Sequence, residues 1–167
     1  ENGKVTFTPE PQFKGDGTGV EVKRVDKNGT PVTAKYTPSV TPVTPTAQPA
    51  VSTNVQGQPQ SGTPTFTEGD SKVPFDDTFG TKLIDPTTHE KVASVTVPDQ
   101  GTYTANPDGT VTFQPVPQFT GEATPVSVER VDTNGTPVQT TYTPTVTPVT
   151  PIGTPVDSTG VQGQTQT

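Results

Sequence analysis

Short runs of alternating apolar and polar residues, separated by turn residues, make up most of this chain, and such runs are typical of β-strands. The clearest run reads GTYTANPDGTVTFQP over residues 101–115. Val111 and Phe113 share one face, and they follow the pair Asp108–Gly109. An Asp-Gly pair tolerates the positive φ angle that a tight turn needs, so this run predicts a β-hairpin.

A second run, KLIDPTTHEKVASVTVP over residues 82–98, predicts another hairpin. Pro86 stands at a turn position, since proline presets the φ angle of a turn residue. Val95 and Val97 alternate on one face of the strand that follows.

A third run, TPVSVERVDTNGTPVQTTY over residues 124–142, follows the same scheme. Val126 and Val128 are in phase, and the pair Asn134–Gly135 forms the turn. Val131 falls out of phase with Val128, which indicates a bulge or a strand end near Arg130.

The chain repeats itself with a period of 106 residues. Residues 3–61 align with residues 109–167 without a gap, and 37 of the 59 pairs are identical. A self-match of this quality indicates a tandem array. We therefore predict that residues 1–46 are the C-terminal part of a preceding repeat, residues 47–152 a complete repeat, and residues 153–167 the start of a following repeat.

Proline-rich runs mark the ends of the repeats. They read TPSVTPVTPTAQPA over residues 37–50 and TPTVTPVTPIGTP over residues 143–155. Such segments favour an extended backbone and act as semi-rigid spacers. Tyr36 and Tyr142 immediately before them indicate that the first residues of each run still form a last strand, at a sheet edge where proline is tolerated.

Composition favours an all-β fold but leaves disorder open as an alternative. Apolar residues are 25% of the chain, and Gly and Pro together number 37 of 167, which is a low apolar content for a folded domain. The apolar residues are mostly Val with Phe and Tyr, and Thr dominates the polar ones, which suits a pleated, half-buried surface. We predict a β-sandwich with six to eight short strands per repeat, little or no helix, and, since the chain has no Met, a longer parent polypeptide.

Charge separates the two copies of the repeat. The net charge of −7 disfavours nucleic acid and anionic membranes as partners, because both require basic patches. A charged binding face needed in every repeat would not lose all of its lysines. Five lysines of the first copy are nevertheless replaced in the second: Lys4, Lys14, Lys23, Lys27 and Lys35 become Thr110, Thr120, Glu129, Thr133 and Thr141.

The residues offer little for catalysis. His89 is the only histidine and there is no cysteine, so hydrolytic triads, histidine-rich metal centres and thiol-ligated zinc sites lack their parts. We expect His89 in an exposed turn, and we expect no catalytic residue, no cofactor and no enzymatic activity. A carbohydrate-processing enzyme would want paired buried acids and an aromatic platform, and the chain has no Trp.

Three weaker site hypotheses remain. Glu68, Asp70, Asp76 and Asp77 could supply oxygen ligands to a structural calcium ion, although a solvated acidic loop explains them equally. The motifs DKNG and DTNG resemble half of a calcium loop, but turn chemistry accounts for their residues. A Lys–Asn isopeptide crosslink could involve Lys72, Lys82 or Asn106, although none of them lies in a recognisable crosslink motif.

Residues 80–138, and most specifically the core GTYTANPDGTVTFQPVPQFTG at residues 101–121, resemble the CshA-type fibril repeat of Gram-positive (streptococcal) surface proteins. The likeness extends over the whole chain. It implies a cell-wall-anchored, extracellular fibrillar adhesin whose repeats form a stalk. It also implies that attachment to host proteins such as fibronectin belongs to a non-repetitive region outside this sequence, so no binding residue is assigned.

The pattern and the resemblance together predict a structural stalk that projects an adhesive region away from the cell. Its expected partners are the neighbouring repeats of the same chain, with a host matrix protein bound through other regions of the parent. The alternative is that the repeat itself is a binding module for a host matrix glycoprotein or another bacterial surface. We further expect residues 1–46 to be marginally ordered, because they lack the first half of a repeat.

Overall fold

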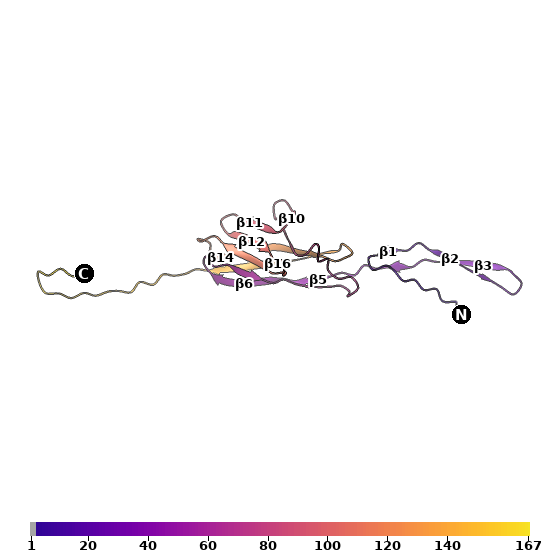
Figure 1. The fold of residues 1–167 in the computed structure, drawn as a ribbon, viewed down its shortest axis with the longest axis horizontal. Coiled ribbons are helices and arrows are strands. Elements are labelled where there is room, and N and C mark those ends of the chain that lie inside the picture. The colour runs from indigo at the N-terminus through magenta and orange to yellow at the C-terminus, as the bar shows by residue number, and fades with distance from the viewer. Residues whose placement is uncertain (1–2) are drawn as a thin grey trace.

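The computed structural model describes residues 3–167, and it arranges three parts of the chain in a row (Figure 1). A thin N-terminal hairpin segment comes first, a two-layered body follows, and an extended C-terminal tail leaves the far end of the body. No helix occurs among the residues described, so the fold is all-β as the sequence predicts.

The N-terminal segment contains four strands in two separate ladders. They are β1 (Gly15–Asp16), β2 (Val20–Val25), β3 (Pro31–Tyr36) and β4 (Ser39–Val40). Strand β1 pairs with β4, and β2 pairs with β3, both antiparallel.

The body contains twelve strands, which is more than the six to eight predicted. Several are only two or three residues long, too short to show an alternating pattern in the sequence. They are β5 (Thr46–Gln48), β6 (Ala50–Val55), β7 (Gln60–Gly62), β8 (Thr65–Thr67), β9 (Lys82–Ile84), β10 (Lys91–Val92), β11 (Ser94–Val97), β12 (Gly101–Ala105), β13 (Val111–Pro115), β14 (Gly121–Glu122), β15 (Val126–Val131) and β16 (Pro137–Thr147).

Two sheets form the layers of the body. The first has the order β10-β9-β15-β16-β14, with β6 pairing in parallel along the other edge of β16. The second has the antiparallel order β11-β12-β13-β7, and β5 and β8 form a small additional ladder. The inner faces of the two sheets pack together, which confirms the β-sandwich.

The core lies between the sheets and is centred on aromatic rings. The ring of Tyr103 on β12 lies 4.6 Å from Phe113 and 6.0 Å from Tyr142, which comes from the opposite sheet. Both tyrosine hydroxyls find partners, because a buried polar atom without one is costly. Tyr103 donates to the carbonyl of Thr124 at 2.6 Å, and the Tyr142 hydroxyl lies 2.7 Å from that of Ser52.

Two predicted hairpins are confirmed with their turns. Strands β12 and β13 are joined through Gly109, which has a φ of +87°, and β15 and β16 through Gly135, which has a φ of +79°. In the second turn Asp132 Oδ1 accepts hydrogen bonds from the backbone N–H groups of Asn134 and Thr136. The motif DTNG is therefore used in this turn.

The hairpin predicted over residues 82–98 is only partly correct. Strands β9 and β10 do form a hairpin, closed by the turn that includes Pro86. The chain then bends at Ala93, and β11, with Val95 and Val97, joins the opposite sheet. Both valines still face the core, as their alternation predicted.

Strand β15 continues to Val131, which pairs with Pro137. The strand end predicted near Arg130 thus falls one residue later, and the ladder continues without a bulge.

The expectation that the last strand lies at a sheet edge is wrong, because β16 has neighbours on both sides. Its Pro144 is buried and cannot donate a hydrogen bond. On one side β16 pairs first with β15 and then with β14, and Pro144 lies level with the gap between these two strands. There the Pro144 carbonyl accepts a hydrogen bond from the N–H of Ala123, and no donor is required of Pro144. A proline therefore fits inside the sheet. The spacer after the strand is correspondingly shorter than the proline-rich run.

Matching residues of the two copies are buried in the body and exposed in the N-terminal segment. Val126 and Phe113 are 4% and 0% exposed, whereas their counterparts Val20 and Phe7 are 52% and 39% exposed. The β2–β3 hairpin has no second sheet to pack against, which is why its apolar face meets solvent.

Candidate functional site: the joint between the N-terminal segment and the body

The linker between the N-terminal segment and the body, residues 41–45, is held against the body. Pro45 is buried, and the backbone of Gly69 lies directly against that of Thr44. A Cβ atom at Gly69 would lie 2.8 Å from the carbonyl carbon of Thr44, so only glycine permits this approach. The linker then continues immediately into β5, which pairs with β8.

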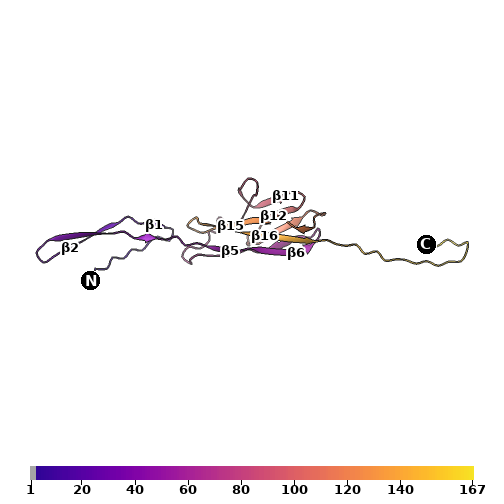
Figure 2. The same cartoon turned by 180° about the vertical axis from the view of Figure 1, so that it is seen from behind.

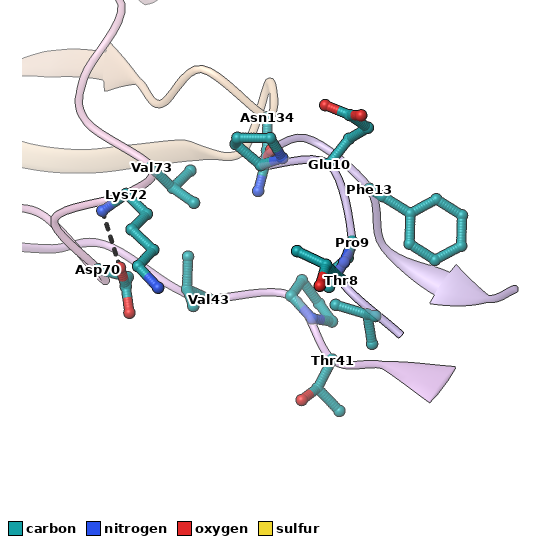
Figure 3. A pocket seen from close by; sticks show the side chains of 13 residues that line it. Thr8, Pro9, Glu10, Phe13, Thr41, Val43, Asp70, Lys72, Val73 and Asn134 are labelled. Atoms are coloured by element: carbon teal, nitrogen blue, oxygen red, sulfur yellow. Dashed lines mark hydrogen bonds between the residues drawn. The ribbon is translucent and has the colours of Figure 1, made fainter. Parts of the chain in front are cut away.

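An open pocket of about 280 Å³ lies at this joint (Figure 3). The N-terminal segment lines one side with the loop at residues 8–13 and with residues 40–43, which follow from β4. The body lines the other side with residues of the β8–β9 loop and of the β15–β16 turn, namely Asp70, Lys72, Val73 and Asn134. The joint is therefore a contact between end loops of the N-terminal segment and of the body.

The β8–β9 loop is shaped by its own hydrogen bonds. Asp70 Oδ1 accepts from the N–H of Lys72 at 2.8 Å, and the Asp70 carbonyl accepts from the N–H of Val73 at 2.9 Å. This turn buries Val73 and leaves the two charged side chains exposed. On the body side, the pocket is therefore lined by the buried Val73 and by two exposed charged residues.

A small aromatic cluster supports the loop from below. The ring of Phe75 lies 6.1 Å from that of Phe66 and 4.7 Å from the guanidinium of Arg130. Arg130 also donates to Asp77 Oδ1 at 3.1 Å. Backbone bonds from the N–H of Asp76 to the Val131 carbonyl and from the N–H of Thr133 to the Pro74 carbonyl also join the loop to β15 and its turn.

The four acids considered for calcium serve different purposes. Asp70 shapes the turn described above, Asp76 Oδ1 accepts from the N–H groups of Thr78 and Phe79, and Asp77 pairs with Arg130. Glu68 is exposed. In the part of the chain that the structure describes, no group of three or more His, Asp and Glu side chains is arranged to hold a metal ion.

His89 lies in the exposed turn between β9 and β10, with a φ of +61°. Its N–H donates to the carbonyl of Asp85 at 2.9 Å. Hydrogen bonds from the N–H groups of Thr88 and Thr87 hold the pKa of Asp85 below its usual value. The charged Asp85 therefore stabilises the turn.

The residues considered for a crosslink lie in different places. Lys82 and Asn106 line one open pocket of about 340 Å³, but the Asn106 amide donates to the hydroxyls of Thr110 and Thr112. Lys72 lines the joint instead. A crosslink would need an amide, a lysine and an acid in mutual contact, and this amide is engaged by threonines.

The sequence does not indicate that the carboxylate of Glu129 is buried. Glu129 on β15 is buried, although it points away from the core-facing side of Val128. Its carboxylate pairs with Lys91 at 2.5 Å and accepts from the Gln139 amide at 2.6 Å. The Lys91 ammonium also lies 5.2 Å from the centre of the Phe79 ring. The alternation of β15 predicts an outward side chain correctly, but only the folded chain shows that Lys91 covers it.

Comparison with solved structures finds repeat domain 13 of the fibrillar adhesin CshA from Streptococcus gordonii, determined by NMR. The sequences are 49% identical over 45% of this chain and 90% of that one, and the TM-score is 0.24. A TM-score this low does not show a shared fold, so the relationship rests on the sequence identity. No curated protein matches the chain.

The family model described as the surface adhesin CshA repetitive domain matches residues 1–40 and 42–146. It therefore covers both the exposed N-terminal copy and the folded body. Membership of this family implies a location at the cell surface, and no helix among residues 3–167 is long and apolar enough to cross a membrane. The chain belongs to the family of CshA surface-adhesin repetitive domains.

Proposed function

We propose that this chain is a structural spacer of a surface fibril, in which folded repeats joined end to end hold an adhesive region away from the cell. The parent protein would be anchored in the cell wall, and the neighbouring repeats would be the partners of each unit. Binding to a host matrix protein would then reside in other regions of the parent.

The observation that carries this proposal is where the chain enters and leaves the body. It enters through β5 and β6 and leaves through β16, and β6 and β16 run parallel side by side (Figure 1). The entry and exit therefore lie at opposite ends of the body. Tandem units connected in this way extend in a line instead of folding back on one another.

The geometry gives an estimate of the length added by each repeat. Thr46 lies nine residues before Val55, which is level with Thr147. At about 3.3 Å per strand residue, with the five residues to Ile152 extended, each repeat advances the fibril by about 45 Å.

Surface charge suits a spacer. Residues 49–167 contain twelve acidic and four basic residues. Like charge on neighbouring fibrils keeps them apart and soluble.

The proposal is tested by the dimensions of longer arrays. Small-angle scattering would be measured for this chain and for versions extended by one, two or four further copies of residues 47–152. We expect the maximum dimension to increase linearly, by about 45 Å per copy. A dimension that rises with the square root of the copy number would show a flexible tether and overturn the proposal. Capture by immobilised host matrix glycoproteins, above the level of an unrelated acidic protein, would favour the binding-module alternative.

A further inference from the structure

The first and last long strands of the body form a parallel ladder of six residue pairs, from Tyr142 with Ala50 to Thr147 with Val55. Figures 1 and 2 show β6 alongside β16 from both sides, with the N-terminal segment joining at the β5 end and the tail leaving past the other. The chain is therefore pulled from opposite ends of this ladder when its two ends are separated.

We propose that the β6–β16 ladder is a mechanical clamp, which bears tension along the fibril and keeps each repeat folded under load. The inference rests on the proposed spacer function, and it adds a specific load-bearing element to that function. The clamp would bear the tension that is transmitted from one repeat to the next.

The direction of pulling determines how the ladder resists. Tension draws β6 toward its N-terminal end and β16 toward its C-terminal end. Because the strands are parallel, this motion slides them past one another, and the hydrogen bonds of the whole ladder are loaded together. A pair pulled apart from the same end would instead lose its bonds one by one. A single hydrogen bond contributes little net free energy, so resistance comes from loading all of them at once.

Two further hydrogen bonds reinforce the same interface. The backbone N–H of Gln56 donates to the Thr147 carbonyl at 2.8 Å, which extends the ladder beyond β6. The Thr147 hydroxyl returns a bond to the Asn54 carbonyl at 3.2 Å. The end of β16 that meets the load is thus held by both backbone and side-chain bonds.

A polar network ties the clamp to the second sheet. The Ser52 hydroxyl lies 2.7 Å from the Tyr142 hydroxyl and donates to Gln60 Oε1 at 2.5 Å. The Gln60 amide in turn donates to the Thr145 carbonyl at 3.1 Å. Strands β6, β7 and β16 therefore cannot slide independently.

The repeat retains this network. Ser52, Gln60 and Tyr142 have identical counterparts 106 residues away, in Ser158, Gln166 and Tyr36. The Ser158 hydroxyl already bonds the Gln166 side chain at 2.9 Å in the tail. The five lysines of the first copy, by contrast, are all replaced. These three side chains persist where surface charge does not.

The ladder alternation provides a matched pair of substitutions. Because the Gln56 N–H faces β16, the N–H of Asn54 faces it too, and that of Thr53 faces the open sheet edge. Asn54→Pro removes a clamp hydrogen bond, whereas Thr53→Pro places the same ring where the N–H has no ladder partner. Asn54→Ala controls for the Asn54 side chain, which donates to the Pro59 carbonyl.

The test is single-molecule force spectroscopy on the full chain. It contains no cysteine, so handles can be attached at introduced ones. Pulling from the two termini loads the ladder in shear, and pulling from Q58C and V149C peels it from one end. We expect a rupture force several-fold higher in shear than in peeling. In shear we expect Asn54→Pro to lower that force clearly, and Thr53→Pro and Asn54→Ala to leave it nearly unchanged.

Equal forces in the two pulling directions would overturn the clamp, as would equal losses in Asn54→Pro and Thr53→Pro. Circular dichroism checks that each variant is folded, and the comparison of directions in the unsubstituted chain needs no variant other than the handles. These outcomes are separate from the scattering test, because an array that lengthens linearly but ruptures easily would retain the spacer function and lose the clamp.

Discussion

The ring of Tyr142 lies directly against the backbone of Gly62 on β7. A Cβ atom added at Gly62 would lie 2.4 Å from Cε2 of that ring and 3.2 Å from the Cβ of Ala50. The missing side chain at position 62 is thus what lets the central tyrosine pack between the sheets.

The first prediction follows from this contact. We expect Gly62→Ala to lower the free energy of unfolding of the body by about 2 kcal/mol, because an overpacked core must displace a large ring. Chemical denaturation of the full chain measures the change. Gly153→Ala is the matched control, since nothing lies within 4 Å of a Cβ there. Similar stabilities for the two variants would contradict the packing argument.

The sequence predicted the features that depend on neighbouring residues. The turns at Gly109 and Gly135 and the core side of Val126 and Val128 follow from dipeptide chemistry and alternation, and the structure confirms them. The repeat also indicated which apolar residues matter, since Phe113 and Tyr142 are retained from the first copy and are fully buried.

Features that depend on distant residues were not predictable in this way. The β6–β16 ladder joins residues 92 positions apart, and no local pattern specifies that the two strands pair in parallel. The close approach of Gly69 to Thr44 requires the two loops to be placed first. The residues that mark the joint are Gly69 and Pro45, and their importance becomes visible only in the folded chain.

The second prediction concerns alkaline pH. Burial raises the pKa of Tyr103 and of Tyr142, and for Tyr142 the hydrogen bond with Ser52 partly offsets the rise. A raised pKa in the folded state means that the stabilisation is complete below the unfolded value, about 10, and is lost as the pH rises above it. We expect ionisation of these two tyrosines, followed by ultraviolet absorbance, to coincide with the loss of β-structure in circular dichroism. Ionisation of both at a pH where the body stays folded would contradict it.

The third prediction concerns acid. The Thr110 hydroxyl and then its backbone N–H, both donating to Asp108, hold the pKa of that carboxyl below its usual value. A lowered pKa stabilises the fold above the unfolded value, about 3.9, and the contribution disappears as the pH falls through the folded value. We expect Asp108→Ala to lower the melting temperature at pH 7 and to have little effect at pH 2. Asp108→Asn, which keeps an acceptor oxygen, is the control. A loss independent of pH would show that the charge is not involved.

The fourth prediction concerns the N-terminal segment. The β2–β3 hairpin exposes the apolar residues that the body buries, so its backbone bonds open without breaking a core. We expect amide hydrogens of residues 20–36 to exchange many-fold faster than those of the equivalent residues 126–142. Native-state hydrogen exchange read by mass spectrometry compares the two segments within one sample, which removes differences in conditions. Equal protection would show that the segment is stabilised by contacts other than those between β2 and β3.

The last prediction concerns the joint. Because the Gly69 backbone lies against that of Thr44, we expect Gly69→Ala to push the linker away from the body and widen the range of angles between the two parts. Spin labels at K27C and T87C, both exposed positions in turns, report this range as the width of their distance distribution. The β5–β8 ladder and the core do not include Gly69, so the melting temperature should change little. Ser71→Ala in the same loop is the control, and a distribution as narrow as that of the unsubstituted chain would show that the linker is held elsewhere.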